Sequence, residues 1–292
     1  MPVLRGRTLL QLPGPTNVPD RVLRAMARPL VDFASPEFTA LARSCLDDLR
    51  LVFQTWGEVF AYVALGHATW EVALANLVGP GEAVLIPDTG MFARRWREAA
   101  EALGVEVRSV ATDWRRAVDA AAVENALRAD KQHRIKAVLQ VHVETSTGVA
   151  HDVAAVRRAI DRAGHPALLV VDAIASLAVM DLPLDEIGAD LVLAASQKGL
   201  MLPPGMGFVA VGERARRAAE RGGMPRRYWD WDVRRGELAY MWFCGTPPVS
   251  MLFGLRESLD MLLEEGLPAV FARHRRLAEA VRRAAASTML PA

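Results

Sequence analysis

Residues 167–175 read ALLVVDAIA, and residues 191–200 read LVLAASQKGL. Each begins as an almost unbroken apolar run of strand length, typical of parallel strands that are buried on both faces. Asp172 ends the first run and Lys198 closely follows the second. Ligands of an open α/β sheet bind beyond the carboxyl ends of its strands, so we expect both side chains at one site.

Strands and helices alternate on both sides of these runs, which predicts an α/β fold with a largely parallel sheet. The residues between Leu12 and Asp20 contain three prolines and predict an irregular arm, followed by a short helix within residues 18–30. Two more helices, 250–265 and 267–286, are split by Gly266-Leu267-Pro268. The other expected strands are 59–65, 83–88, 105–110, 135–144 and 207–212, and the other expected helices are 68–78, 92–104, 115–130 and 151–164.

Composition narrows the class of protein. The 292 residues are 52% hydrophobic and 24% charged with a net charge of +1, which suits a globular domain and disfavours a general nucleic-acid binder. No apolar run reaches membrane-spanning length, so we expect no membrane association. Two cysteines, Cys45 and Cys244, are too few for a disulfide framework and indicate a reducing compartment, which predicts a cytoplasmic protein.

Lysine is rare in this chain, since only Lys131, Lys136 and Lys198 are present among 35 basic residues. A partly desolvated lysine has a lowered pKa and can form a Schiff base. A carboxylate at the end of a neighbouring strand can hold a protonated ring nitrogen, and the two groups together are what pyridoxal phosphate requires. A solvated lysine and an Asp172 that merely caps the next turn are the alternative interpretations.

A phosphate group would find backbone N–H donors where Gly66-His67-Ala68 joins a strand to a helix. The same residues could form a plain turn. Phe92, after Thr89-Gly90-Met91, is a candidate to cover a cofactor ring, although an ordinary core residue would also fit this position.

Other classes of site lack their sequence signatures. No G-x-G-x-x-G, G-K-[ST] or G-x-S-x-G motif is present, which disfavours a dinucleotide-binding oxidoreductase, a P-loop NTPase and a serine hydrolase. His142 and Glu144 alternate on one strand without a third ligand, so we expect no metal. Trp229 and Trp231 alternate with aspartates, which favours a loop at a subunit interface over a nucleic-acid surface.

The chain resembles the class V aminotransferases, which are fold-type I pyridoxal-phosphate enzymes, and within them the serine–glyoxylate and alanine–glyoxylate types. The resemblance implies a large domain with a mostly parallel seven-stranded sheet between helices. It also implies transfer of the amino group of L-serine or L-alanine to glyoxylate, giving glycine. The motifs that carry it are LPGPTNVPDRVLRAMARPL, HVETSTGV, VVDAIASL, SQKGLMLPPGMGFVAV, YWDW, GLRESLDMLLEEGL and VFARHRRLAEA.

The matching positions imply roles for individual residues. Lys198 is the Schiff-base lysine and the base that moves the substrate Cα proton, Asp172 pairs with the ring nitrogen, and Phe92 stacks on the ring. Thr246 would reach the phosphate of a partner subunit, which implies a homodimer. Further cofactor contacts are Gly66, His67, Ala68, Thr145, Ser196 and Gln197, and the substrate side is lined by Thr16 and Asn17.

The sequence departs from the family in three places. Leu65 replaces a hydroxyl residue, Val143 stands where relatives have Asn, and an aromatic hydroxyl near Thr246 is replaced in the stretch Trp242-Phe243-Cys244-Gly245. The family continues into a small domain whose arginine pairs with the substrate carboxylate, and nothing after residue 281 matches it. We therefore expect an arm (1–20), a large domain (21–250), and connecting helices with the start of a truncated small domain (251–292). This expectation predicts cofactor binding with poor turnover, and leaves open a degenerate homologue or a class V lyase, for which Cys244 is the candidate cysteine.

Overall fold

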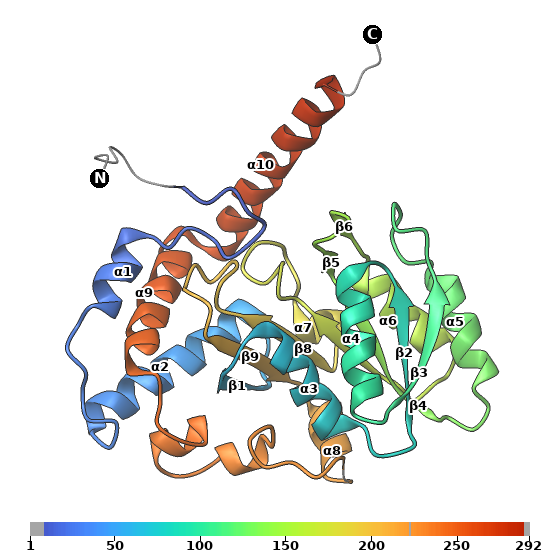
Figure 1. Cartoon of the computed structure of the whole chain (residues 1–292), viewed down its shortest axis with the longest axis horizontal. Coiled ribbons are helices and arrows are strands. Elements are labelled where there is room, and N and C mark those ends of the chain that lie inside the picture. The colour runs from blue at the N-terminus through green and yellow to red at the C-terminus, as the bar shows by residue number, and fades with distance from the viewer. Residues whose placement is uncertain (1–8, 222, 289–292) are drawn as a thin grey trace, which may run out of the picture.

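A seven-stranded sheet forms the centre of the molecule, with strand order β1-β9-β8-β7-β4-β2-β3 (Figure 1). The computed structural model describes residues 9–221 and 223–288. Strands β2, β3, β4, β7 and β8 run parallel to one another, and β9 runs antiparallel to both β1 and β8. The predicted α/β class and the mostly parallel seven-stranded sheet are therefore confirmed.

The chain alternates between strands and helices over most of its length. The strands are β1 (Glu58–Val63), β2 (Ala83–Asp88), β3 (Glu106–Ala111), β4 (Ile135–Val141), β5 (Val143–Glu144), β6 (Val149–Ala150), β7 (Leu168–Asp172), β8 (Leu191–Ala195) and β9 (Met206–Val211). The helices are α1 (Asp20–Met26), α2 (Pro36–Phe53), α3 (Gly66–Leu77), α4 (Met91–Ala102), α5 (Ala120–Ala129), α6 (Val153–Arg162), α7 (Leu184–Ile187), α8 (Glu213–Ala219), α9 (Val249–Glu265) and α10 (Leu267–Thr288), with 3-10 turns η1 (Asp232–Arg234) and η2 (Ala239–Phe243). Among the described residues, no helix is both long and apolar enough to cross a membrane.

Two hydrophobic cores cover the two faces of the sheet, because alternate residues of each strand point to opposite faces. In β7, Leu169 and Val171 belong to the core that contains α2, α5, α6 and α9, whereas Leu168 and Val170 belong to the core that contains α3, α4 and α8. All five residues of β7 are buried. The near-continuous apolar sequence of this strand is thus explained by packing on both sides.

Several predicted elements have different bounds in the structure, and three of the differences have a clear local cause. The strand expected at 135–144 ends at Val141, because the chain after His142 turns into the small β5–β6 hairpin. The helix expected at 115–130 begins at Ala120, where the Asp119 side chain accepts a hydrogen bond from the Ala121 amide and caps the helix. The strand expected to reach Ala175 ends at Asp172, whose carboxylate accepts from the Ile174 amide at 2.8 Å and bends the chain away.

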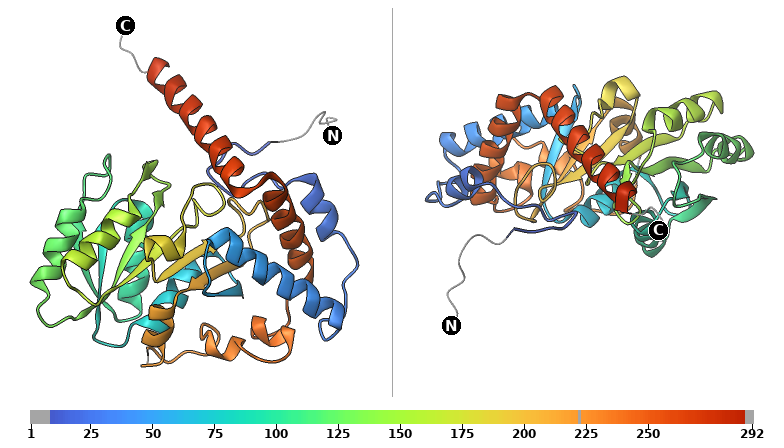
Figure 2. Two further views of the ribbon diagram at one scale, coloured as in Figure 1. Left: turned by 180° about the vertical axis from the view of Figure 1, so that it is seen from behind. Right: turned by 90° about the horizontal axis from the view of Figure 1, so that it is seen from above.

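The long helix α2 is not among the predicted elements. Its start nevertheless carries two recognisable signals, since the Ser35 side chain accepts from the Phe38 amide and Pro36 occupies the first helical position. At the other end of the chain, α9 stops at Gly266, which has a φ of +80°. Helix α10 then extends away from the body of the molecule (Figure 2), with Leu277 and Val281 exposed.

Candidate active site

A cavity of about 300 Å³ lies beyond the carboxyl ends of β4, β7 and β8. Strand β7 supplies Asp172, and the loop after β8 supplies Gln197 and Lys198. The start of α3 and the start of α4 face the same space. Of the predicted site residues, seven line this one cavity: Gly66, His67, Phe92, Thr145, Asp172, Gln197 and Lys198.

Asp172 is a buried carboxylate with a fixed orientation. Its Oδ1 accepts from the Ile174 amide at 2.8 Å, and its Oδ2 accepts from the Trp70 indole Nε1 at 2.7 Å. Burial raises the pKa of this carboxyl to about 6, although both hydrogen bonds act in the opposite direction. Asp172 is therefore an anion near pH 7 that is costly to desolvate and is complementary to a cation in the cavity.

Lys198 reaches the same cavity from the loop that follows β8. Its Nζ donates to the Pro13 carbonyl at 2.9 Å, and burial lowers the pKa of its ammonium against the opposing effect of Asp172. Gly14, with a φ of +149°, brings the N-terminal arm so close that a Cβ there would clash with Nζ. The arm therefore packs directly on the lysine.

The first turn of α3 faces the cavity without a side-chain cap. Leu65 occupies the N-cap position, where it accepts no side-chain hydrogen bond from the helix amides, and it is exposed. The positive end of this 12-residue helix is therefore suited to an anion. Burial lowers the pKa of His67, and the Arg95 charge adds to this effect, so the imidazole is neutral near pH 7.

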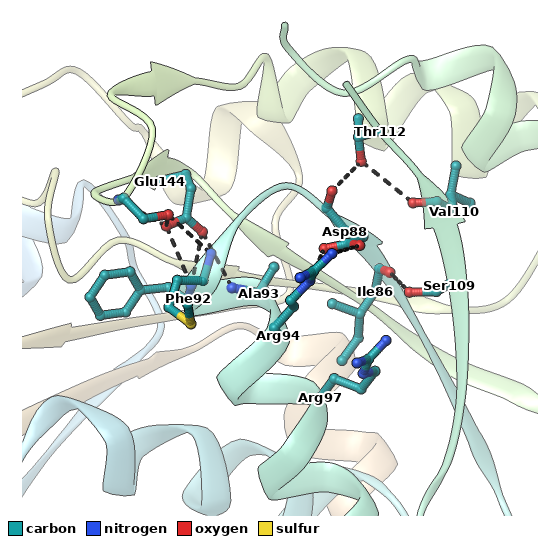
Figure 3. A network of polar contacts seen from close by, with 12 residues as sticks. Ile86, Asp88, Phe92, Ala93, Arg94, Arg97, Ser109, Val110, Thr112 and Glu144 are labelled. Atoms are coloured by element: carbon teal, nitrogen blue, oxygen red, sulfur yellow. Dashed lines mark hydrogen bonds and ion pairs between the residues drawn. The ribbon is translucent and has the colours of Figure 1, made fainter. Parts of the chain in front are cut away.

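Glu144 fixes the start of α4 and with it the backbone of Phe92 (Figure 3). The wholly buried carboxylate accepts from the amides of Phe92 and Ala93 at 3.2–3.3 Å and from the Ser146 hydroxyl at 2.6 Å. Gly90, with a φ of +156°, leaves room for this carboxylate, since a Cβ there would clash with the Glu144 Cγ. An anion at a helix N-terminus is favourable, and here it also secures the aromatic residue at the cavity.

The remaining predicted site residues lie outside the cavity lining. The Ser196 hydroxyl is occupied within its own loop, because it donates to the Pro203 carbonyl at 2.7 Å and accepts from the Met206 amide. Ala68 lies in the first turn of α3, and Thr246 is exposed beyond η2. Thr16 holds the arm on the lysine loop through the Gln197 and Lys198 carbonyls, and Asn17 pairs with Leu10.

Trp70 is not among the predicted site residues, yet it lines the cavity and contacts Asp172. It follows Gly66 by four residues and His67 by three, and such positions share one face of a helix. This spacing is the feature of the sequence that could have placed Trp70 at the site. Gln197 has a buried Oε1 with no hydrogen-bond partner among the described residues, which marks a place for a donor from a bound molecule.

Two other sequence features have structural roles. The His142 ring pairs with the Ser176 hydroxyl at 2.9 Å while Glu144 caps α4, and within residues 9–221 and 223–288 no cluster of three metal-ligating residues is found. The Trp231 side chain is fully buried and stacks on Phe60 in this chain's own core, so it does not itself face a partner, and the interface expected for this loop stays a prediction.

Comparison with known proteins identifies the family. The Aminotransferase class-V family profile matches residues 63–288. The chain belongs to aminotransferase class V. It is 43% identical to the serine–glyoxylate aminotransferase of Methylorubrum extorquens, over 97% of this chain and 72% of that protein. It is 42% identical to the L-aspartate–glyoxylate aminotransferase of Paracoccus denitrificans, over 94% of this chain and 69% of that protein.

A solved structure agrees with this assignment. The alanine–glyoxylate aminotransferase of Nostoc sp. superimposes with a TM-score of 0.86 at 31% identity, over 96% of this chain and 71% of that one. The predicted class V family and fold type are thus confirmed. The lyase alternative can be compared with the same site: Cys244, which a lyase would need beside a cofactor, ends η2 and does not line the cavity.

Proposed function

We propose that this class V aminotransferase uses pyridoxal 5′-phosphate to transfer the amino group of L-serine to glyoxylate, which yields glycine and the 2-oxo acid of the donor. L-Alanine is the second donor in the proposal. The observation that carries it is the convergence of Lys198 and Asp172, with a helix N-terminus, on one cavity at the edge of the sheet. The 43% identity to a serine–glyoxylate aminotransferase supports the choice of substrates.

The residues present fit this cofactor. The start of α3 at Gly66 would hold its phosphate, and Asp172 would hold its ring nitrogen in the protonated form. Phe92 would cover the ring, and the unpaired Gln197 Oε1 points to a further polar contact. When bound, pyridoxal phosphate supplies an electron sink that stabilises negative charge at the substrate Cα.

Lys198 has the properties of the general base in this reaction. Its amine must be neutral to take a proton from the substrate Cα, and burial favours the neutral form by lowering the ammonium pKa. The Asp172 carboxylate opposes that shift, so the amine can also carry a proton while the reaction proceeds. The close approach of Gly14 and the hydrogen bond to the Pro13 carbonyl hold the amine against the arm at the cavity.

A homodimer is part of the proposal. Thr246 is exposed and does not line the cavity of its own chain, as expected of a side chain that serves a partner subunit. Light scattering should give twice the 31.9 kDa mass of one chain. A monomer at micromolar concentration that still binds the cofactor fully would contradict this part.

The test of the function is a donor comparison with purified protein and added pyridoxal 5′-phosphate. Glycine formation from glyoxylate is followed with L-serine, L-alanine and L-aspartate as donors. The proposal expects L-serine or L-alanine to give the highest kcat/KM. A preference for L-aspartate would instead align the chain with its Paracoccus relative, and no transfer from any donor would contradict the aminotransferase reaction itself.

A further inference from the structure

The side chain of Trp70 connects the core of the large domain to the cavity. It lies in α3, is 1% exposed, and donates its indole N–H to the Asp172 Oδ2 at 2.7 Å. Most buried indoles find some acceptor, but a carboxylate at a cavity is an unusual one with chemical consequences. A donor to the charged form of a carboxyl stabilises that form.

Packing fixes the indole in this orientation. The Trp96 ring stacks on the Trp70 ring with centroids 5.8 Å apart and planes 15° apart, and the His67 ring meets it edge-on at 4.5 Å. Both neighbours restrict rotation of the indole away from Asp172. The hydrogen bond is therefore built into the core and does not depend on a bound ligand.

The Trp70 hydrogen bond opposes the effect of burial on the ionisation of Asp172. Burial and the Glu144 charge favour the neutral carboxyl, whereas Trp70, the Ile174 amide and Lys198 favour the carboxylate. Two of these groups donate hydrogen bonds to Asp172: Ile174 from its backbone amide and Trp70 from its side chain. Loss of the indole N–H should therefore favour the neutral carboxyl of Asp172 near neutral pH, although the Ile174 amide and Lys198 would still stabilise the carboxylate.

We propose that Trp70 is a positioning residue that keeps the Asp172 carboxylate ionised and aimed into the cavity. The inference deepens the proposed function, since the cation that Asp172 faces is there taken to be the ring nitrogen of pyridoxal phosphate. The role of Trp70 toward Asp172 itself can be measured without any cofactor.

Trp96 provides a matched control. It is fully buried beside Trp70, and its Nε1 has no hydrogen-bond partner among the described residues. Trp70→Phe and Trp96→Phe remove the same atoms from the same core, but only the first removes a donor to Asp172. If the role of Trp70 were purely structural, the two variants would shift the titration of Asp172 equally.

The first experiment titrates the cofactor-free protein by NMR. The Ile174 amide donates to Asp172 Oδ1, and neither tryptophan substitution removes this donor, so its resonance can report the ionisation of Asp172. We expect its midpoint near pH 6 in the wild type and in Trp96→Phe, and higher by about 1–2 in Trp70→Phe, because a hydrogen bond to a charged group is lost. Asp172→Asn identifies any residual titration, such as that of His67. Equal midpoints in the wild type and Trp70→Phe, or equal shifts in both tryptophan variants, would overturn the inference.

The wild-type indole gives a readout that needs no variant to fold. The Trp70 indole proton should move with the same midpoint as the Ile174 amide, while the Trp96 indole proton should not follow it. A Trp70 resonance that is constant from about pH 5 to 8 would overturn the proposed contact.

The second experiment measures pyridoxal 5′-phosphate binding at pH 7 and pH 9. If the Asp172 pKa rises by about 1–2, its ionised fraction at pH 7 falls from about nine-tenths to between roughly one-half and one-tenth, so Kd rises about 2–10-fold in Trp70→Phe. The difference from Trp96→Phe should shrink at pH 9. A pH-independent difference would contradict the inference. If no form binds the cofactor, the proposed function fails, while the Ile174 titration still decides the role of Trp70.

Discussion

Asp172→Asn should change how the stability of the cofactor-free protein depends on pH. Burial raises the pKa of Asp172 from 3.8 to about 6, so the folded state binds a proton there more tightly than the unfolded chain. The resulting stabilisation is complete below about pH 4 and is lost as the pH rises through about 6. A difference of about two pH units corresponds to roughly 3 kcal/mol of unfolding free energy.

The assay is urea unfolding of the wild type and Asp172→Asn between about pH 4.5 and 7.5. Asn cannot ionise, so in the variant this position does not lower the unfolding free energy as the pH rises through about 6. The unfolding free energy of the variant minus that of the wild type should therefore increase by roughly 2 kcal/mol over this range. Asp47→Asn, on the exposed side of α2, is the matched control. If this difference stays constant within about 0.5 kcal/mol, the claim that burial raises the pKa of Asp172 is refuted.

Three further predictions concern the cap of α4, the buried Arg234 of η1, and the expected partner contact of Thr246. Glu144→Gln should lower the unfolding free energy by roughly 2–4 kcal/mol in urea, because a buried charged cap of α4 is lost, whereas the exposed Glu186→Gln should change it by less than about 0.5. Arg234→Met leaves three carbonyl groups without their donor and should cost roughly 3 kcal/mol; a loss below about 1 would show that water replaces the guanidinium. If the proposed homodimer forms, Thr246→Val should raise the Kd of pyridoxal 5′-phosphate several-fold without changing the mass found by light scattering, and an unchanged Kd would remove this residue from the site.

The ends of the strands explain how much of the site could be predicted. Asp172 and Lys198 follow apolar runs, and parallel strands bring their carboxyl ends to one edge, so two distant residues are placed together by topology alone. Trp70 was missed because the rotation of α3 about its axis, which decides what its face contacts, depends on packing against Trp96 and the sheet. Ser196 is the opposite case: it was predicted as a cofactor contact, but its hydroxyl is used by its own loop, and the sequence does not show this bonding.

Local hydrogen bonds explain the errors in element bounds. The strand at 135–144 continues as an apolar alternation past Val141, but the His142 amide bonds to the Asp172 carbonyl and its carbonyl accepts from the His151 amide, which starts the hairpin. The alternation of side chains in the sequence predicts a strand, but it does not show which group each backbone amide will bond to. The family and its fold type, by contrast, were predictable because their motifs are spread over the whole chain.

The central claim is that Lys198 is the residue that holds pyridoxal 5′-phosphate, and reductive trapping tests it most directly. The purified protein is incubated with the cofactor, reduced with borohydride, digested and mapped by mass spectrometry. With only Lys131, Lys136 and Lys198 in the chain, the outcome is unambiguous. The account predicts the cofactor on Lys198 and no stoichiometric label in Lys198→Ala; a stoichiometric label on Lys131 or Lys136, or none on the wild type, would contradict it.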